Sequence, residues 1–214
     1  RDMAAARPGA RFVVDVKSTG LFSSDPDLRR LGARTEYWKT GHSHMKARVA
    51  ETGALAGFEK SGHYFLAPPI GKGYDDGMRV AVELCKLMDR NPGAKFSDLR
   101  KALPVVHNTP TMSPFCPDEE KYGVIDRLQK KLVAMGDAGE SLGPRRITEV
   151  VTVNGARVML ENGAWALVRA SSNTPNLVVV CESPESREEL RAIFEAIDAV
   201  IRTEPTVGDY DQTF

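Results

Sequence analysis

The sequence predicts a parallel α/β sheet domain, incomplete at its N-terminus, followed by a small α+β domain with a mostly antiparallel sheet. In the first half of the chain, short apolar runs rich in β-branched residues alternate with helical patterns, as they do in parallel sheets. After residue 144, strand patterns follow one another directly, and Asn154-Gly155 and Asn162-Gly163 favour hairpin turns. We therefore expect a domain at 1–110, a linker and helix at 111–144, and a domain at 145–214.

The first domain is expected to alternate strands and helices. Residues 1–6 are typical of a helix that ends before Pro8-Gly9, and the apolar, β-branched run at 11–16 is typical of a buried parallel strand. The remaining expected strands and helices are, in order, a helix at 25–31, a strand at 35–38, a helix at 43–51, a strand, loop and strand within 55–65, a helix from Asp75 or Asp76, and a helix at 97–103.

The helix after Asp76 has apolar residues at helical spacing, namely Met78, Ala81, Val82, Cys85 and Met88. We interpret Asp75 and Asp76 as caps of this helix, because carboxylates are favourable at a helix amino end.

The second domain is expected to have a simple order of elements. A helix at 118–135 precedes it and places its apolar residues on one side: Val124, Ile125, Leu128, Leu132 and Met135. Strands are expected at 147–153, 156–160, 164–168 and 177–181. An amphipathic helix at 185–201 then turns its apolar residues inward: Leu190, Ile193, Phe194, Ile197 and Ile201.

The composition argues against several classes of partner. Lysine plus arginine and aspartate plus glutamate balance at 29 each, so no global field recruits nucleic acid or an anionic membrane. The three cysteines form no C-x-x-C pair, which indicates neither a disulfide framework nor a zinc site. No apolar run approaches the roughly 20 residues of a membrane helix, and no signal peptide is recognisable. We expect a cytoplasmic protein and, since the first residue is Arg1, the later part of a longer one.

A polar loop interrupts the apolar pattern at 55–65, which reads L-A-G-F-E-K-S-G-H-Y-F. The loop contains the carboxylate of Glu59, the hydroxyl of Ser61, a flexible Gly62 and the imidazole of His63. Together these groups can hold a polyhydroxylated ligand through several hydrogen bonds. Taken alone, Glu59 could equally be a surface carboxylate beside Lys60.

A second polar loop, R-A-S-S-N-T-P, lies at 169–175 between two expected strands. Arg169 offers a planar fork for two phosphate oxygens, and backbone amides can point into the same concavity. Short hydroxyl and amide donors follow Arg169 at Ser171, Ser172, Asn173 and Thr174. Without further context, an ordinary polar turn with a surface arginine is the commoner reading.

Three further residues are candidates for chemistry. Lys17 stands at the end of the first strand, where ligand-binding residues of parallel sheets concentrate. His42 and His63 could bind phosphate or sugar and transfer protons, because imidazole titrates near neutral pH. Lone histidines are usually structural, and we assign that role to His44 and His107.

These loops resemble motifs of the α-D-phosphohexomutases, the phosphomannomutase/phosphoglucomutase group. G-F-E-K-S-G-H-Y-F resembles the family's sugar-binding loop, in which a Glu-x-Ser-Gly-His pattern closes over the hexose. Four more stretches match in the family's order: V-V-D-V-K-S-T at 13–19, W-K-T-G-H-S at 38–43, Y-D-D-G at 74–77 and R-A-S-S-N-T-P at 169–175. The resemblance spans nearly the whole chain, and it identifies the chain as the end of the family's third domain plus its fourth domain.

The resemblance implies roles for the loop residues. Glu59 and Ser61 match residues that contact the hexose, with the carboxylate on the hydroxyls at C3 and C4. Lys17 matches a lysine beside the phosphoryl group being transferred, and Arg169 with Ser171 matches the clamp on the non-transferring phosphate. The loops depart from the common pattern at Phe58, Lys60 and Ser172-Asn173, where the family usually has glycine, methionine or a small residue, and Asn-Thr.

The resemblance also implies an enzyme that interconverts hexose 1-phosphate and hexose 6-phosphate through a phosphoserine and a bisphosphate intermediate. Its phosphoserine loop and its Mg²⁺ loop have no match in this sequence, so we assign no metal to this chain and expect the chain alone to be inactive. The implied partners are a phosphosugar, the N-terminal domains of the same polypeptide, and glucose 1,6-bisphosphate as activator. Phosphoglucosamine mutase, a phosphopentomutase relative and a non-catalytic sugar-phosphate-binding module remain alternatives.

Overall fold

The computed structural model describes residues 1–214, and the chain divides into two units, Arg1–Val105 and Val106–Phe214. This division differs from the three expected segments, because 111–144 is not a separate linker. Helix α7 (Lys121–Asp137) packs against the strands of the second unit with Val124, Leu128 and Leu132 fully buried. None of the helices combines the length and the apolar character that spanning a bilayer requires.

The first unit is built on a four-stranded sheet in the order β2-β1-β3-β4. The strands are β1 (Arg11–Asp15), β2 (Arg34–Trp38), β3 (Ala56–Phe58) and β4 (Tyr64–Leu66). Strand β1 runs parallel to β2 and β3, whereas β4 returns antiparallel to β3. The parallel sheet predicted from the alternating pattern is therefore confirmed, with one antiparallel edge strand.

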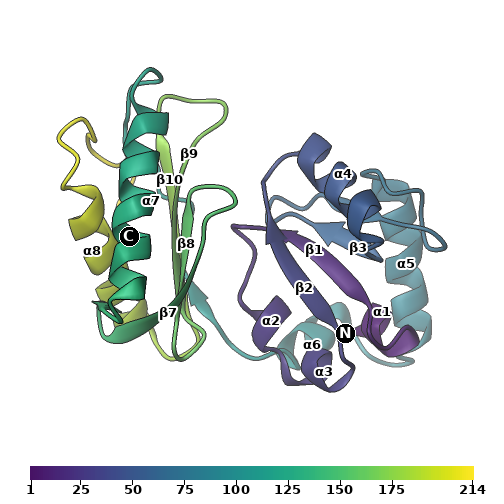
Figure 1. Ribbon diagram of the computed structural model, residues 1–214. Coiled ribbons are helices and arrows are strands. Elements are labelled where there is room, and N and C mark those ends of the chain that lie inside the picture. Colours follow the sequence, from purple (N-terminus) through teal and green to yellow (C-terminus); the bar gives the residue numbers. More distant parts are fainter. The chain divides into compact units, whose positions relative to one another are not determined.

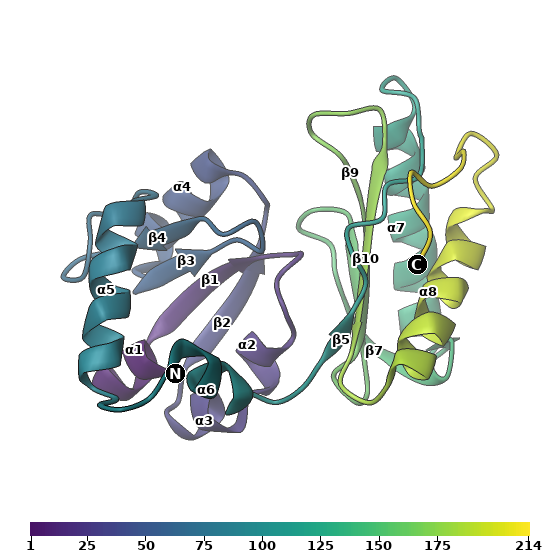
Figure 2. The ribbon, with the colours of Figure 1, turned by 180° about the vertical axis from the view of Figure 1, so that it is seen from behind.

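Helices cover both faces of this sheet (Figure 2). Helix α4 (His42–Thr52) packs Met45 and Val49 against Val13 and Phe65 on one face. The opposite face is covered by α1 (Asp2–Ala6), α3 (Pro26–Arg30) and α5 (Gly77–Asp89), through side chains such as Leu28. The short helices α2 (Leu21–Ser24) and α6 (Phe96–Lys101) complete the unit.

Helix α5 forms where it was expected but presents a different face to the sheet. Of its five predicted apolar positions, Met78, Ala81, Val82 and Cys85 are exposed. Instead the half-buried Val80 and Leu87, together with the exposed Leu84, line a cavity of about 220 Å³ that is also lined by sheet residues such as Phe12 and Phe58. Because Arg79, Glu83 and Lys86 form one charged stripe and apolar residues occupy the rest of the circumference, the spacing predicts a helix without identifying which apolar side faces the sheet.

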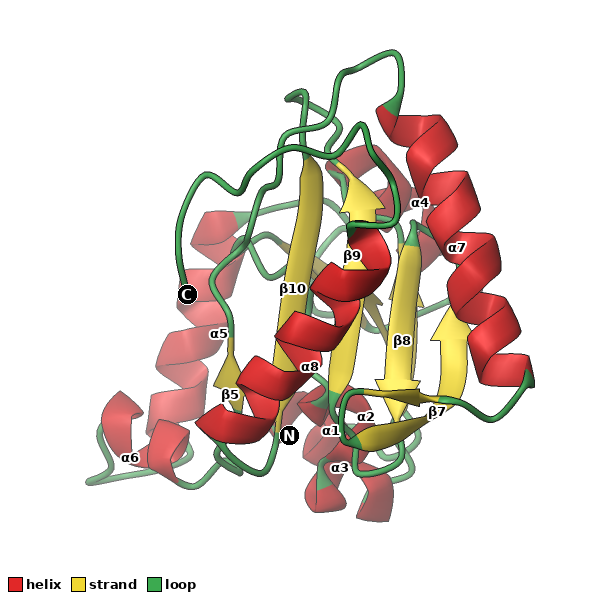
Figure 3. Cartoon of the chain, turned by 90° about the vertical axis from the view of Figure 1, so that its left-hand side faces the viewer, coloured by secondary structure: helices red, strands yellow, loops and turns green.

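The second unit contains an antiparallel sheet in the order β5-β10-β9-β8-β7-β6. Its strands are β5 (His107–Asn108), β6 (Ser141–Leu142), β7 (Arg145–Val151), β8 (Ala156–Leu160), β9 (Trp165–Ala170) and β10 (Leu177–Ser183). Helices α7 and α8 (Arg187–Ile201) lie on the same face of the sheet (Figures 1 and 3). The predicted antiparallel α+β domain is confirmed, and the two-residue strands β5 and β6 are additions to it.

Candidate functional site

Three loops of the first unit meet at one edge of its sheet. Lys17 follows β1, His42 begins α4 shortly after β2, and the loop 59–63 joins β3 to β4. Because β1, β2 and β3 are parallel neighbours, their carboxyl ends lie side by side, which is where α/β sheets usually bind ligands. The sequence places these loops up to some 45 residues apart, and the sheet brings them together.

The buried carboxylate of Asp15 connects all three loops. Its Oδ1 accepts hydrogen bonds from the Ser18 hydroxyl at 2.7 Å and the Lys60 backbone N–H at 3.1 Å. Its Oδ2 accepts one from the Thr40 hydroxyl at 3.0 Å and lies 3.7 Å from Nζ of Lys17. Asp15 is fully buried, so it fixes the relative positions of the loops from beneath.

The carboxylate of Glu59 is held in place from two sides. Gly41 donates its backbone N–H to Oε1 at 2.8 Å, and the hydroxyl of Ser61 donates to Oε2 at 3.2 Å. Gly41 has a φ of 124°, a conformation open to glycine, which allows its N–H to point at Glu59. A carboxylate has about four lone-pair sites, so Glu59 keeps the capacity to accept further hydrogen bonds from a ligand.

His63 and His42 form an imidazole pair above this carboxylate. Their ring centroids are 4.3 Å apart, and both side chains are substantially exposed, at 40% and 56%. Nδ1 of His63 lies 2.8 Å from Oδ2 of Asp75, which favours the tautomer with the proton on Nδ1 and leaves the lone pair of Nε2 for a ligand. Asp75 therefore orients a candidate catalytic side chain.

The two aspartates before α5 have separate roles. Asp76 caps the helix, as predicted, by accepting the backbone N–H of Arg79 at 2.9 Å. Asp75 does not cap it but binds His63 and the backbone N–H of Tyr64. Burial raises the pKa of Asp75, but the hydrogen bonds from Tyr64 and His63 outweigh burial and lower that pKa below its ordinary value.

The second candidate loop connects β9 to β10 in the second unit, where it was predicted. Arg169 is largely buried at the end of β9, and its Nη1 donates to the carbonyl of Ala170 at 2.7 Å. The Ser171 and Thr174 hydroxyls are hydrogen bonded to each other at 2.8 Å, and the side chains of Ser172, Asn173 and Thr174 are exposed. The loop thus presents hydroxyl and amide donors to solvent beside a guanidinium group.

Lys121 supports this loop from behind, a contact that the sequence did not reveal. Its side chain is 5% exposed, and Nζ donates to the carbonyl of Thr174 at 3.0 Å and to Asp118 at 2.6 Å. A buried ammonium group is costly unless it is paired, so these contacts anchor the loop on α7.

Sequence reasoning found the candidate ligand-contacting residues but missed those that position them. The structure brings Lys17, His42, Glu59, Ser61 and His63 together in the first unit, and it groups Arg169, Ser171, Ser172, Asn173 and Thr174 in one loop of the second. Asp15 and Lys121 were not recognised, although Asp15 lies inside the V-V-D-V-K-S-T stretch. An acidic residue within an apolar strand was the available signal, because a buried charge requires partners.

Comparison with known proteins gives a consistent assignment. Residues 1–106 match the model of phosphoglucomutase/phosphomannomutase alpha/beta/alpha domain III, and residues 116–200 match that of the C-terminal domain of the same family. A phosphomannomutase/phosphoglucomutase of Pseudomonas putida is 34% identical over 206 residues, which cover 96% of this chain and 41% of the relative. The chain therefore spans about two fifths of that relative.

Solved structures show the same architecture. A phosphoglucomutase/phosphomannomutase family protein of Burkholderia thailandensis superposes with a TM-score of 0.79 at 28% identity, covering 99% of this chain and 41% of that one. An Aspergillus fumigatus N-acetylphosphoglucosamine mutase, solved with GlcNAc-6P and magnesium, superposes with a TM-score of 0.53 at 13% identity, covering 94% and 43%. At that identity the second likeness concerns the fold alone.

Proposed function

The chain belongs to the phosphoglucomutase/phosphomannomutase family and spans its domains III and IV, and we propose that it supplies the sugar- and phosphate-binding loops of a phosphohexomutase. The proposed reaction interconverts hexose 1-phosphate and hexose 6-phosphate, with mannose or glucose as the hexose. The observation that carries the proposal is the convergence of Lys17, Glu59 and His63 at the carboxyl ends of β1 and β3, over the shared support of Asp15.

Glu59 is proposed to bind two adjacent hydroxyls of the hexose, those at C3 and C4. Its oxygens are oriented by Gly41 and Ser61 and can accept additional hydrogen bonds on their outer side. Glucose and mannose differ only at C2, so a site that binds the hydroxyls at C3 and C4 accepts either sugar. His42 and Ser61 complete the proposed sugar contacts.

Lys17 and His63 are proposed as the catalytic residues of this chain. The ammonium group of Lys17 is 3.7 Å from Asp15, and a phosphoryl group in transfer carries negative charge that such an ammonium stabilises. His63 presents Nε2 outward with its tautomer fixed by Asp75, an arrangement suited to accept or donate a hydroxyl proton.

The loop at 169–175 is proposed to bind the phosphate that is not transferred. Arg169 would provide charge, and Ser171, Ser172, Asn173 and Thr174 would provide neutral donors. A phosphate held by several donors from one short loop is well defined in position, which the mutase reaction needs while the hexose is turned over.

The carboxylates of the candidate site in the first unit differ from a binding site for the Mg²⁺ that the family uses. Mg²⁺ requires an octahedral set of oxygen ligands. Both oxygens of Asp15 are already bonded to protein donors, as are those of Asp75, and the remaining groups near Glu59 are imidazoles. These residues do not fit Mg²⁺, so we propose that the ion, like the phosphoserine, is held by domains outside this chain. Glucose 1,6-bisphosphate is the proposed activator.

An NMR titration of the chain with glucose 1-phosphate and with mannose 1-phosphate tests the proposal. We expect both sugars to shift amide resonances of 59–63 and of 169–175. Glu59→Ala should abolish the shifts in the first loop and Arg169→Ala those in the second. Glu51→Ala and Arg146→Ala, which remove charged side chains of the same types at exposed positions, are the matched controls.

Two outcomes would contradict the proposal. One is that the folded chain binds neither sugar phosphate at millimolar concentration, even when the domains preceding it in its polypeptide are present. The other is that Glu59→Ala and Arg169→Ala bind as the control variants do. A mutase assay on the longer polypeptide separates the enzyme from a sugar-phosphate-binding module, because only the enzyme converts mannose 1-phosphate to mannose 6-phosphate.

A further inference from the structure

The side chains of His42, Glu59 and His63 form a cluster of metal-ligand type within the first unit. Each offers one ligand atom, and these atoms all lie within 4.8 Å of one another. We propose that this cluster binds a transition-metal ion of the Zn²⁺ class, and that the bound ion excludes the sugar from the loop. No spacing in the sequence indicates a metal here, because the three residues are spread over 22 positions in two loops.

The donor set suits zinc rather than magnesium. Two imidazoles and one carboxylate with an open fourth position form one of the common ligand sets of zinc in proteins. Imidazole nitrogen is a borderline donor that favours Zn²⁺, Co²⁺, Ni²⁺ and Cu²⁺, whereas Mg²⁺ prefers oxygen. The cluster therefore discriminates against the magnesium ion used elsewhere in the family.

An outer shell of hydrogen bonds already supports the cluster. Metal-binding histidines usually donate their second N–H to a carboxylate, and His63 has Asp75 in that position at 2.8 Å. The carboxylate of Glu59 is likewise fixed by Gly41 at 2.8 Å. These contacts leave Nε2 of His63 and further lone pairs of Glu59 available to a ligand.

The ligand atoms of the three side chains must move slightly closer together to bind zinc. Ligands at about 2.1 Å from a tetrahedral zinc stand roughly 3.4 Å apart, so the outermost atoms of the cluster must approach by somewhat more than 1 Å. The side chains of His42 and His63 are 56% and 40% exposed, so rotation about their χ angles can supply this movement while Glu59 remains fixed.

Zinc and sugar would use the same atoms. A bound ion occupies the outer lone pairs of Glu59 and Nε2 of His63, which the proposed function assigns to hexose hydroxyls. Binding is then mutually exclusive, and by linkage each ligand weakens the other by the same factor. This exclusion rests on the proposed function, whereas metal binding itself does not.

Cobalt(II) titration of the whole chain, followed by visible absorption, tests metal binding. Co²⁺ in a tetrahedral site gives intense visible bands, and Zn²⁺ should abolish them by displacement at one equivalent. The chain has four histidines, which provide two test positions and two matched controls. We expect His42→Ala and His63→Ala to lose the bands, and His44→Ala and His107→Ala to keep them.

Asp75→Asn tests the outer shell, with an expected loss of about 10- to 100-fold in metal affinity. Retention of the bands in His42→Ala or in His63→Ala, or absence of any Zn²⁺ binding by calorimetry, would overturn the proposed site. Circular dichroism of each variant shows whether it is folded. Glu59→Gln preserves the shape of the side chain and provides a second test of the proposed metal site.

Glucose 1-phosphate added to the cobalt-bound chain tests the exclusion, with inorganic phosphate as control because phosphate alone can chelate cobalt. We expect glucose 1-phosphate, but not inorganic phosphate at the same concentration, to bleach the bands. Bands that persist while glucose 1-phosphate shifts the resonances of 59–63 would refute mutual exclusion. If the metal-free protein binds no sugar phosphate even with the preceding domains of its polypeptide present, the proposed function fails and the zinc site stands.

Discussion

Gly155 lies so close to Arg169 that a Cβ added to Gly155 would stand 2.6 Å from Cβ of Arg169 and 2.3 Å from the carbonyl oxygen of Val168. Gly155 belongs to the turn between β7 and β8, and Arg169 is the last residue but one of β9. The hairpin turn therefore packs directly under the start of the proposed phosphate loop. A residue with a side chain at position 155 would displace the loop's arginine.

Gly155→Ala should reduce both stability and phosphate binding. Its φ of 73° costs an alanine about 1 to 2 kcal/mol, and the overlap with Val168 and Arg169 adds to this, for a total of about 3 kcal/mol. Gly163→Ala is the matched control, since Gly163 has a φ of 87° in the neighbouring hairpin turn but open space around it. Urea unfolding and glucose 1-phosphate titration would measure the difference. Equal losses in both variants would refute the packing argument.

Lys121→Met should loosen the proposed phosphate loop without removing any group from its exposed surface. The carbonyl of Thr174 loses its buried ammonium donor, so we expect faster hydrogen exchange in 171–175 and roughly fivefold weaker phosphate binding, about 1 kcal/mol. Lys130→Met, at an exposed position of the same helix, should change neither quantity. An unchanged rate of amide hydrogen exchange in Lys121→Met would show that the position of the loop does not depend on Lys121.

Asp15→Asn should destabilise the first unit and weaken sugar binding together. The substitution keeps the shape of the side chain but removes a buried charge that accepts hydrogen bonds from Ser18, Thr40 and Lys60, at an expected cost of about 3 kcal/mol. The exposed Asp89→Asn should change stability by less than about 0.5 kcal/mol. Urea unfolding followed by Trp38 fluorescence, with Trp165 replaced by phenylalanine, reports this unit. Stability equal to that of Asp89→Asn would contradict the role given to Asp15.

Short sequence patterns predicted the hairpins and the long helices of the second unit. Asn154-Gly155 and Asn162-Gly163 gave the two hairpins because their glycines supply the positive φ that such turns need, and α7 and α8 followed from one-sided apolar spacing. Strands β5 and β6 could not be predicted, since each has two residues and exists only through its pairing with β10 or β7.

The residues proposed to contact ligands could be singled out from the sequence, whereas the residues that position them could not. Glu59 and Arg169 stand in polar loops that interrupt apolar strands, which sequence reading detects. Asp15 reaches Lys60 across 45 positions, and Lys121 reaches Thr174 across 53. Such contacts depend on how the strands and helices pack, and a single sequence does not encode them in any spacing.

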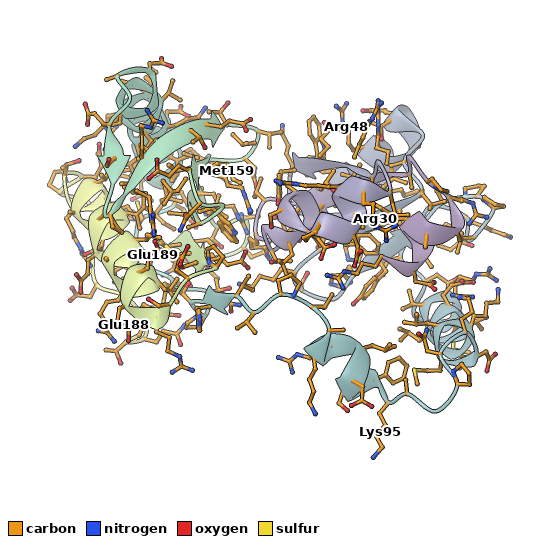
Figure 4. All side chains as sticks on the ribbon, turned by 90° about the horizontal axis from the view of Figure 1, so that it is seen from below. Arg30, Arg48, Lys95, Met159, Glu188 and Glu189 are labelled. Carbon is orange, nitrogen blue, oxygen red and sulfur yellow. The ribbon has the colours of Figure 1, made fainter.

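Glu189 should make the second unit sensitive to acid. The carboxylate, on the first turn of α8 (Figure 4), is 8% exposed and accepts hydrogen bonds from Arg145 Nε at 2.6 Å, from the Asn162 amide and from the Ser183 hydroxyl. Burial raises the pKa of Glu189, but these partners outweigh burial and lower it below its ordinary value. The carboxylate thereby joins α8 to three separate segments of the sheet.

The sign of the pH effect follows from that lowered pKa. A group with a folded-state pKa below its unfolded value binds fewer protons when folded, so its stabilisation is complete above the unfolded pKa of about 4.3 and is lost as the pH falls below it. Glu189→Gln should therefore destabilise the unit by about 3 kcal/mol at pH 7. The difference in free energy of unfolding between this variant and the parent protein should become smaller below about pH 4. The exposed Glu195→Gln, on the same helix, should match the parent at every pH. The test is urea unfolding followed by Trp165 fluorescence in a Trp38→Phe background, measured from pH 7 to pH 3. A difference in stability between Glu189→Gln and the parent protein that stays constant with pH would disprove the role of the charge.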